Sequence, residues 1–496
     1  MGRFAPHTMS ARCIMVLGTS SGAGKSWLTT ALCRHYARQG LKVAPFKAQN
    51  MSNNARVVAS HAGLGEIGSA QYFQALAARA VPDVRMNPLL LKPEADTRSQ
   101  VVLLGRVDPE LSETPWHERS EKVWPQIAAA LDALRADNDV VVIEGAGSPA
   151  EINLMASDIV NLRVARHANA QCLLVTDIDK GGAFAHLYGT WALLPPEDQQ
   201  RIRGFVLNKF RGDARLLHPA PEMLHTLTGV PTVAVLPMWW QHGLPEEDGV
   251  FDDRSLVRGA VTKTVAVLAY PRISNLDEFQ SLKNVPGLRL LWAHSPADLH
   301  ALQPDDWVVL PGSKHTSSDL AWLRQQGLDA AVAKHARQGG AVLGICGGLQ
   351  MLGEALIDPH GIDGNAPGLG LLPLVTQFSA DKTVRQTHAR FAQVQGAWAS
   401  LTGVELSAYE IHHGQTQGHS AMLAGGAVLH EVIPGLAWQN GTGQVLGTYL
   451  HGLFECPAVL QALFGVQAPT LETVFDGLGD FVARHFAEGV LDTLGR

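Results

Sequence analysis

The chain has 496 residues, of which 46% are hydrophobic and 17% are charged. That much apolar material excludes an intrinsically disordered chain, and the length allows two large domains or about three of ordinary size. The balance of 39 basic and 46 acidic residues, a net charge of −7, argues against an extended nucleic-acid-binding surface, although it allows a local basic pocket for an acidic small molecule.

The sequence carries no recognisable targeting or membrane signal. No apolar run has the roughly 18 residues that a membrane span needs, and residues 1–10 lack the apolar centre of a signal peptide. We interpret residues 1–10 as an N-terminal extension, with Met9 as an alternative start. The five cysteines are odd in number and widely scattered, unlike a disulfide framework. A cytoplasmic protein with no membrane span is therefore expected.

Short apolar segments alternate with turns and helical patterns along the chain. Runs such as VVVIEG, residues 140–145, lack polar alternation, as strands covered by helices on both faces do. The pattern predicts an α/β protein with two doubly wound domains and mostly parallel sheets. The predicted strands of the first domain are Cys13–Leu17, Leu41–Phe46, Val140–Ile143, Cys172–Val175, Gly204–Leu207 and Thr232–Leu236. Those of the second are Val265–Leu268, Leu288–Trp292, Val308–Leu310, Ala341–Ile345 and Leu446–Leu450.

A domain boundary is expected within Trp239–Gly259, which is acidic, rich in turn residues and poor in periodic pattern. We therefore divide the chain into a first domain of residues 11–238, a linker of residues 239–262 and a second domain of residues 263–496. Between Leu471 and Leu494, apolar residues recur at helical spacing. This stripe predicts a C-terminal helix packed on the second domain.

A glycine-rich loop, GTSSGAGKS, follows the first predicted strand and precedes a helical pattern. Strand, loop and helix start together direct backbone N–H groups at an anion, so we expect a nucleotide phosphate site. Lys25 is expected to contact the terminal phosphates and Ser26 to bind Mg²⁺. The loop differs from G-x-x-x-x-G-K-[ST] because position 19 is Thr and the leading glycine comes one residue earlier. The predicted binding residues are Gly18, Thr19, Ser20, Gly22, Gly24, Lys25 and Ser26.

Further polar residues follow predicted strands of the first domain. Glu144 ends one strand at the carboxyl edge, where ligands bind in this architecture, and its carboxylate suits Mg²⁺. Lys47 could bridge phosphate and a substrate carboxylate, or simply be solvated. Asn208 could read a base edge or be a turn residue. Asp177–Gly182 could contact phosphate or metal, or form the turn into a helix.

The one-residue-longer loop, Lys47 and the run Glu144-Gly-Ala-Gly resemble dethiobiotin synthetase and its relatives from Cys13 to Leu236. The resemblance implies that MgATP is used to activate a carboxylate.

In the second domain, the apolar run Ala341–Ile345 leads directly into Cys346-Gly-Gly. A strand, a small residue flanked by glycines and a helix start are typical of a nucleophile elbow, and the helix dipole favours a thiolate. His451 ends another predicted strand and can serve as the base for Cys346. The backbone N–H groups near Gly312 and Gly347 could form an oxyanion hole.

These features resemble the class I (triad) glutamine amidotransferase domain from Thr264 to Glu455. The resemblance implies that the thiolate attacks the glutamine amide, releases ammonia and leaves a thioester that water hydrolyses. The sequence departs from that family at Leu453, where glutamate is usual two residues after the histidine. Whether Glu455 or another group orients His451 is open at this point.

An ATP-dependent carboxylate activator fused to an ammonia generator resembles the corrin-ring amidases of cobalamin biosynthesis nearly end to end. The cobyric acid synthase branch is favoured over the cobyrinic acid a,c-diamide synthase branch by five motifs: Phe46–Asn53, Glu144–Asn153, Asp177–Gly182, Pro271–Asn275 and Pro311–Lys314. The favoured branch implies glutamine, ATP, Mg²⁺ and a corrinoid, with amidation of the b, d, e and g carboxylates of adenosylcobyrinic acid a,c-diamide. The alternatives are the a,c-diamide synthase and a regulatory P-loop ATPase with a degenerate amidotransferase module.

Two of the second domain's polar stretches also have simpler interpretations. Asn275-Leu-Asp-Glu278 has the spacing of a helix capping box. Tyr409-Glu-Ile-His412 could be an ordinary edge strand with His412 as a surface histidine. For Asn275 and His412 we favour these structural interpretations.

Overall fold

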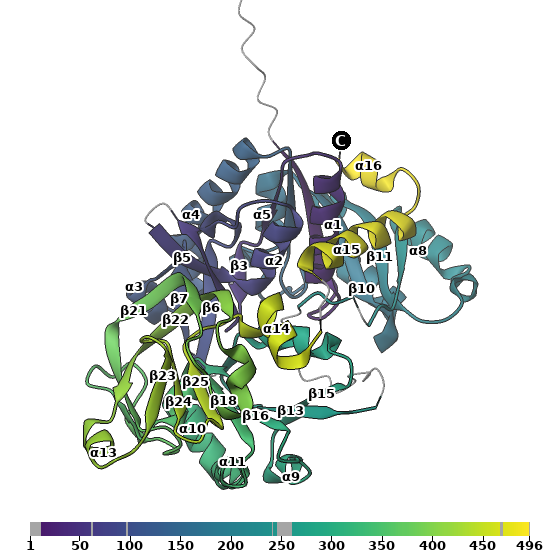
Figure 1. Ribbon diagram of the computed structural model, residues 1–496. Helices are drawn as coiled ribbons and strands as arrows, with labels where there is room; N and C mark the ends of the chain where they lie inside the picture. Colours follow the sequence, from purple (N-terminus) through teal and green to yellow (C-terminus); the bar gives the residue numbers. More distant parts are fainter. Residues whose placement is uncertain are drawn as a thin grey trace, which may run out of the picture.

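The computed structural model describes residues 11–60, 63–95, 98–240, 242–245, 260–466 and 470–495. The predicted extension of residues 1–10, with Met9, and most of the predicted linker lie outside the described residues. Two α/β domains lie against each other, the N-terminal one above and the C-terminal one below in Figure 1.

The first domain is built on a six-stranded parallel sheet of order β12-β11-β10-β1-β9-β2. Met15 and Leu17 face one apolar core, while Ile14 and Val16 face another, and all four are fully buried. Burial on both faces explains the apolar run without alternation. The strands are β1 (Arg12–Gly18), β2 (Val43–Phe46), β9 (Val140–Glu144), β10 (Gln171–Asp177), β11 (Ile202–Phe210) and β12 (Thr232–Pro237). The helices described here are α1 (Lys25–Arg38), α2 (Ser69–Ala77), α3 (Pro109–Glu113), α4 (Trp116–Asp137), α5 (Leu162–Ala168), α6 (Ala183–Ala192), α7 (Pro196–Gln199) and α8 (Ala220–Thr228).

The second domain has a seven-stranded sheet of order β15-β13-β16-β18-β25-β24-β23. The first five strands are parallel, and the last two continue the sheet in antiparallel pairing. The predicted fold class, two mostly parallel α/β domains, is confirmed. The strands are β13 (Lys263–Leu268), β15 (Leu288–Ala293), β16 (Trp307–Leu310), β18 (Ala341–Ile345), β25 (Val445–Thr448), β24 (Ala437–Asn440) and β23 (Leu429–Ile433). The helices described in this half are α9 (Pro296–Leu299), α10 (Thr316–Gln325), α11 (Leu328–Arg337), α12 (Gly347–Leu352), α13 (Ser420–Ala424) and α14 (Pro457–Phe464).

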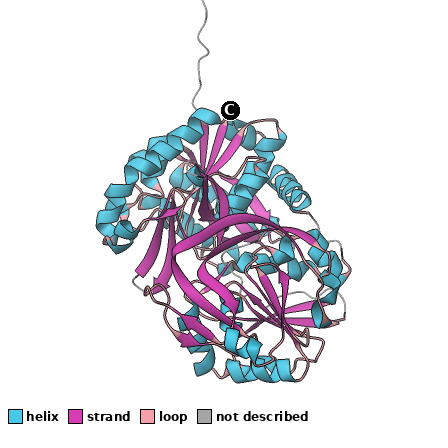
Figure 2. Cartoon of the chain, turned by 60° about the vertical axis from the view of Figure 1, so that its left-hand side comes forward, coloured by secondary structure: helices cyan, strands magenta, loops and turns pink. Residues whose placement is uncertain are grey.

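Smaller sheets, which the sequence pattern did not predict, join the domains. The long hairpin of β21 (Leu374–Arg390) and β22 (Glu405–Gly418) curves across the middle of Figure 2 and packs on β4 (Ala55–Ser60) and β5 (Gly63–Gly68). Nε2 of Gln386 donates to the Val57 carbonyl at 3.1 Å across this contact. The remaining short strands are β3 (Gln49–Met51), β6 (Leu89–Ala95), β7 (Arg98–Leu103), β8 (Arg106–Val107), β14 (Ile273–Ser274), β17 (Gly312–Ser313), β19 (Ala355–Ile357) and β20 (Ala366–Pro367).

The C-terminal stripe forms helices as predicted, but the expectation that it packs on the second domain is wrong. Helices α15 (Leu471–His485) and α16 (Val490–Gly495) lie on the first domain, beside α1 in Figure 1. Phe475 of α15 is buried in the same core as Leu28 of α1. Nε of Arg34 donates to Asp476 at 2.8 Å, and Arg34 also pairs with Glu472. The chain therefore returns to the first domain after completing the second.

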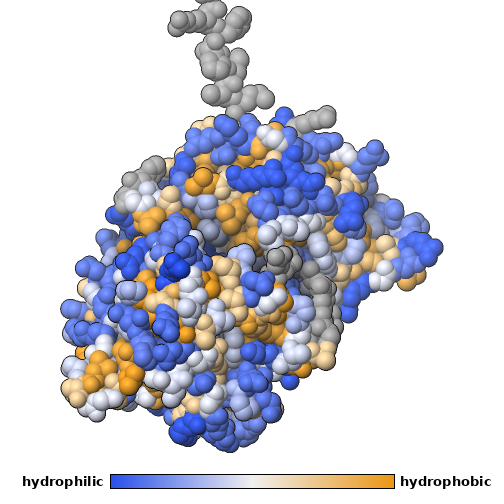
Figure 3. Space-filling model, in the orientation of Figure 1, coloured by the Kyte–Doolittle hydropathy of each residue, from blue (hydrophilic) through white to orange (hydrophobic). Residues whose placement is uncertain are grey.

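No helix among the described residues is long and apolar enough to cross a membrane. Figure 3 shows hydrophilic residues over much of one face, with an apolar patch near α13. That patch includes the exposed side chains of Met422, Leu423 and Val428.

Candidate active site

The glycine-rich loop lies between the end of β1 and the start of α1, as the strand, loop and helix pattern predicts. Nζ of Lys25 donates to the carbonyls of Ser20 at 2.9 Å and Gly147 at 3.1 Å. A Cβ at Gly18 would lie 2.9 Å from that Nζ and 3.0 Å from the Ser20 carbonyl oxygen, so glycine suits this close approach. Gly24 has a φ of 97°, which favours glycine, and it precedes the first residue of α1.

Glu144 lies at the centre of a buried polar cluster beside the loop. Its Oε1 accepts hydrogen bonds from Ser26 Oγ at 2.8 Å and from Lys47 Nζ at 2.7 Å. Its Oε2 accepts one from Gln74 Nε2 at 2.5 Å. Burial raises the pKa of Glu144, but Lys47 and the hydrogen bonds outweigh burial and hold the pKa below its ordinary value. The structure thus joins three predicted residues, Ser26, Lys47 and Glu144, and adds Gln74, which sequence reasoning missed.

Asn208 and Lys209 at the end of β11 support the loop from its other side. Nδ2 of Asn208 donates to the Ala23 carbonyl at 3.0 Å. Nζ of Lys209 donates to the Gly22 carbonyl at 2.9 Å and lies 3.2 Å from Oδ2 of Asp177. Asp177 is therefore connected to the loop through Lys209. Gly181 and Gly182 form the turn into α6.

Cys346 occupies a strained turn between β18 and α12. Its φ of 51° and ψ of −105° lie outside the regions that non-glycine residues favour. A Cβ at Gly344 would lie 2.7 Å from the backbone of Gly348, and one at Gly348 would overlap the Leu310 carbonyl. These glycines let the turn approach its neighbours closely, as the elbow pattern predicts.

His451 lies between Cys346 and an acid that sequence reasoning did not identify. Nδ1 of His451 lies 3.2 Å from Oε1 of Glu278, whose Oε2 accepts a hydrogen bond from the Gly452 N–H at 3.1 Å. Glu278 is fully buried in the 3₁₀ segment Leu276–Asn284. Burial lowers the pKa of His451, but the charges of Glu278 and Cys346 outweigh it and raise the pKa to about 10.

Glu455, the acid closer to His451 in sequence, bonds elsewhere. Its two carboxylate oxygens accept hydrogen bonds from the Arg56 guanidinium at 2.5 and 3.0 Å. Glu278, and not Glu455, is therefore the acid that contacts His451.

The two glycines predicted for an oxyanion hole lie beside this pair. A Cβ at Gly312 would lie 2.9 Å from Cε1 of His451, and a Cβ at Gly347 would lie 2.7 Å from the Ser313 backbone nitrogen. Strand β17, which contains Gly312, is held by antiparallel pairing with β14.

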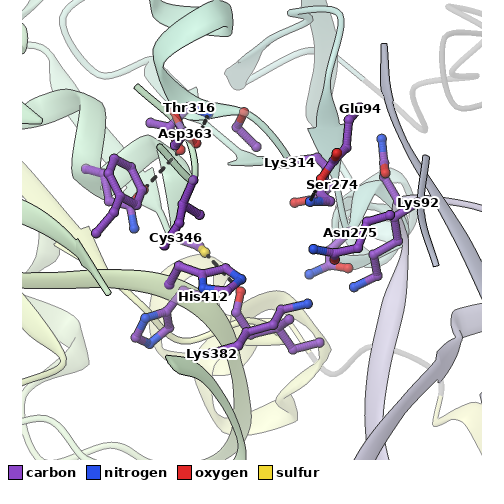
Figure 4. A pocket seen from close by; sticks show the side chains of 18 residues that line it. Lys92, Glu94, Ser274, Asn275, Lys314, Thr316, Cys346, Asp363, Lys382 and His412 are labelled. Carbon is purple, nitrogen blue, oxygen red and sulfur yellow. Dashed lines mark hydrogen bonds and ion pairs between the residues drawn. The ribbon is translucent and has the colours of Figure 1, made fainter. Parts of the chain in front are cut away.

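A pocket in front of Cys346 lies between the domains. Figure 4 shows Cys346 and His412 on one side and Lys92, Asn275 and Lys314 on the other. The pocket has a volume of about 90 Å³. The first domain contributes Asn53, Lys92, Glu94 and Gln100 to its wall.

Ion pairs between the domains surround the pocket. Nζ of Lys314 donates to Glu94 at 2.9 Å, and Nζ of Lys382 donates to Glu66 at 2.5 Å. Lys92 also pairs with the buried Glu66. Burial, reinforced by Lys382 and Lys314, lowers the pKa of Lys92 to about 7 despite the opposing charge of Glu66. The pocket wall is therefore rich in amino groups.

Comparisons with known proteins agree with both halves of this geometry. Residues 14–241 match the CobQ/CobB/MinD/ParA nucleotide binding domain, and residues 264–459 match the CobB/CobQ-like glutamine amidotransferase domain. A protein of Acidovorax ebreus named Cobyric acid synthase is 74% identical over 98% of this chain and 99% of its own length. Proteins of that name from Polaromonas naphthalenivorans and Variovorax paradoxus are also 74% identical, over 98% of this chain and all of theirs. The chain belongs to the cobyric acid synthase family.

In this member of the cobyric acid synthase family, two simpler interpretations need correction. The Asn275 side chain does not cap the segment that follows it. Instead its Oδ1 accepts a hydrogen bond from the Ala55 N–H of the first domain at 3.0 Å. His412 is buried rather than on the surface, and its Nε2 lies 3.2 Å from Oε2 of Glu410. Both residues line the pocket in front of Cys346.

Proposed function

We propose that this chain converts adenosylcobyrinic acid a,c-diamide to adenosylcobyric acid in the cytoplasm. It amidates the b, d, e and g carboxylates with ammonia from glutamine at the expense of ATP, and it needs no nucleic acid or membrane. The near full-length likeness to relatives named Cobyric acid synthase supports this assignment. The observation that carries the chemistry is the presence of two sites in one chain, the loop around Lys25 and the Cys346–His451–Glu278 group.

The second domain is the ammonia generator. The Cys346 thiolate attacks the glutamine amide carbon while the N–H groups near Gly312 and Gly347 hold the developing oxyanion. His451, protonated at neutral pH, gives its proton to the departing ammonia. Water that loses a proton to His451 then cleaves the thioester, releasing glutamate and regenerating the thiol. Glu278 keeps the imidazole oriented and stabilises its charge throughout.

The first domain activates the carboxylate, because a carboxylate oxygen is a poor leaving group until it is phosphorylated. Residues Gly18 to Ser26 hold the ATP phosphates through backbone N–H groups, with Lys25 turning from its carbonyl partners toward them. Lys47 holds the substrate carboxylate beside the terminal phosphate in this proposal, and Asn208 contacts the base. The hydrogen bond from Asn208 to the Ala23 carbonyl also supports the loop.

Ser26 and Glu144 would hold Mg²⁺. The fit is good because hydroxyl and carboxylate oxygens suit a hard cation and the two groups are 2.8 Å apart. In addition, the buried Oε1 of the neighbouring Gln74 has no hydrogen-bond partner among the described residues. When bound, Mg²⁺ neutralises phosphate charge and polarises the transferred group.

Mass spectrometry of the corrinoid after incubation with the protein, MgATP and glutamine tests the assignment. We expect four successive carboxylate-to-amide conversions of adenosylcobyrinic acid a,c-diamide. Conversion of cobyrinic acid at positions a and c instead would favour the a,c-diamide synthase. Hydrolysis of ATP with neither corrinoid consumed would favour a regulatory ATPase.

Replacing Glu278 by Gln should shift the pH dependence of glutamine hydrolysis. Glu278 raises the pKa of His451, so without its charge the imidazolium loses its proton at lower pH. We therefore expect the alkaline limb of kcat/KM to move to lower pH, with a loss of about 10²- to 10⁴-fold near neutral pH. Glutamate release measured from neutral to alkaline pH provides the readout.

The variant Glu455→Gln is the matched comparison, since it neutralises the acid closer to His451 in sequence. Because Glu455 bonds to Arg56 and not to His451, it should move the alkaline limb less. A larger shift in Glu455→Gln than in Glu278→Gln would assign the third position to Glu455.

A further inference from the structure

A side chain of the nucleotide-binding domain lies directly behind the glutaminase residues. Arg56, on β4, is 3% exposed and reaches across the domain boundary. It pairs with Asp277 and donates to both carboxylate oxygens of Glu455, at 3.0 and 2.5 Å. Both acids belong to the amidotransferase domain, so this guanidinium is a buried connection between the two halves.

Each partner of Arg56 is adjacent to a member of the catalytic group. Asp277 immediately precedes Glu278 in the same 3₁₀ segment. Glu455 ends the short turn Leu453–Glu455, which follows Gly452, and the Gly452 N–H donates to Glu278 at 3.1 Å. Arg56 therefore links the 3₁₀ segment that contains Glu278 to the turn that follows Gly452, whose N–H donates to Glu278.

Arg56 also contacts the residue that covers His451. Its guanidinium carbon lies 4.9 Å from the centre of the Tyr409 ring, an arrangement typical of a cation–π contact. The Tyr409 ring stacks on the His451 imidazole, with centroids 5.4 Å apart and planes 22° apart. Tyr409 and His451 further exchange backbone hydrogen bonds of 3.0 and 3.3 Å. Tyr72 and Phe73 of the first domain close the other side of the guanidinium.

The charges of this cluster depend on one another. Three buried or half-buried carboxylates, Asp277, Glu278 and Glu455, lie close to two cations, Arg56 and His451. Burial lowers the pKa of Arg56, but Asp277 and Glu455 outweigh it and hold the pKa well above its ordinary value. Without Arg56, Asp277 and Glu455 would repel Glu278 inside the protein, and buried like charges move apart or take up protons.

We propose that Arg56 is a positioning residue of the glutaminase site, supplied by the nucleotide-binding domain. This inference rests on the proposed glutaminase activity of Cys346. Arg56 fixes the two turns around Glu278 and the Tyr409 ring on His451, so that the imidazole is held toward Cys346. The same segment contains Lys47, nine residues before Arg56, which pairs with Glu144 at the nucleotide site. One short stretch of the first domain thus contacts both reaction centres.

The test compares glutamine-dependent and ammonium-dependent amidation in the full-length variants Arg56→Met and Arg56→Lys. Arg56→Met should lower kcat for glutamine hydrolysis about 10²-fold, with KM for glutamine and ammonium-dependent amidation each within about threefold of wild type. Arg56→Lys keeps the charge but not the forked geometry, so it should recover part of the lost kcat.

Arg34→Met is the matched control. Arg34 is also a fully buried arginine of the first domain that pairs with two acids from a distant segment, Glu472 and Asp476. It lies away from both sites, so Arg34→Met should keep the wild-type ratio of glutamine-dependent to ammonium-dependent rates even if it destabilises the fold.

Three results would overturn the proposal: an unchanged kcat for glutamine in Arg56→Met, an equal fall in both rates, or a similar change of ratio in Arg34→Met. If Arg56→Met does not fold, Arg56→Lys decides alone, and a wild-type ratio there counts against the proposal while a lowered ratio supports it. Failure of the proposed glutaminase activity, on which this inference rests, is distinguishable, because wild-type protein would then release no glutamate.

Discussion

Cys346→Ala should abolish glutamine-dependent amidation while leaving ammonium-dependent amidation intact. The substitution removes the sulfur that forms the thioester, so the loss should be about 10³-fold or more. The nucleotide loop and the Glu144 cluster lie in the other domain. Corrinoid amidation with either glutamine or an ammonium salt as nitrogen donor provides the measurement.

The matched control for this variant is Cys456→Ala. Cys456 is a free, partly exposed cysteine of the same domain, and its sulfur donates a hydrogen bond to the Glu405 carbonyl at 3.8 Å. Its replacement should leave both activities near wild type. Retention of glutamine-dependent amidation in Cys346→Ala would remove Cys346 from the mechanism, and loss of the ammonium reaction would show that the two sites are not separable.

The parts of the site that could be predicted are those in which a short run of sequence determines its own geometry. Gly18 to Ser26 forms its loop between a strand and a helix, and Cys346 forms its turn between glycines. His451 follows a strand paired with β18, so both residues emerge at one edge of the sheet. Parallel strands bring their carboxyl ends together, which is why these residues could be grouped from sequence alone.

Glu278 and Arg56 could not be found this way, because their contacts depend on tertiary packing. Glu278 lies 173 residues from His451 in sequence, in a stretch whose spacing suggested an ordinary helix cap. Arg56 meets Glu455 across 399 residues and a domain boundary. The available signal was the leucine at position 453, where the amidotransferase family usually has glutamate. It implies that another acid contacts the histidine, but it does not indicate which one.

The same distinction applies to the fold. Strands buried on both faces are apolar throughout and were predicted, whereas β21 and β22 carry many polar, partly exposed residues that give no clear strand pattern. These two strands pair with each other and also pack on the other domain. The stripe of α15 specifies a helix but not the surface it covers. That surface is the apolar core around α1, which buries Phe475, and beside it lies Arg34, more than 400 residues away, whose buried charge is paired by Glu472 and Asp476.

Lys25→Met should eliminate amidation with either glutamine or ammonium as nitrogen source, whereas Cys346→Ala should eliminate only the glutamine-dependent reaction. Methionine keeps most of the aliphatic stem but removes the charge that faces the transferred phosphoryl group, a loss expected to cost about 10²- to 10³-fold or more. Release of glutamate from glutamine should persist, because Lys25 contacts carbonyls of its own domain and no residue of the Cys346 group among its described partners.

The two reactions of one molecule therefore serve as controls for each other. Persisting glutaminase activity shows that the Lys25→Met protein is folded, so its loss of amidation reports on the nucleotide site and not on stability. If Lys25→Met still amidates the corrinoid with ammonium at a rate near wild type, the loop does not hold the reacting phosphates. If it loses both reactions, Lys25 acts on the fold or on the coupling between domains, and the assignment of Lys25 to phosphate alone is wrong.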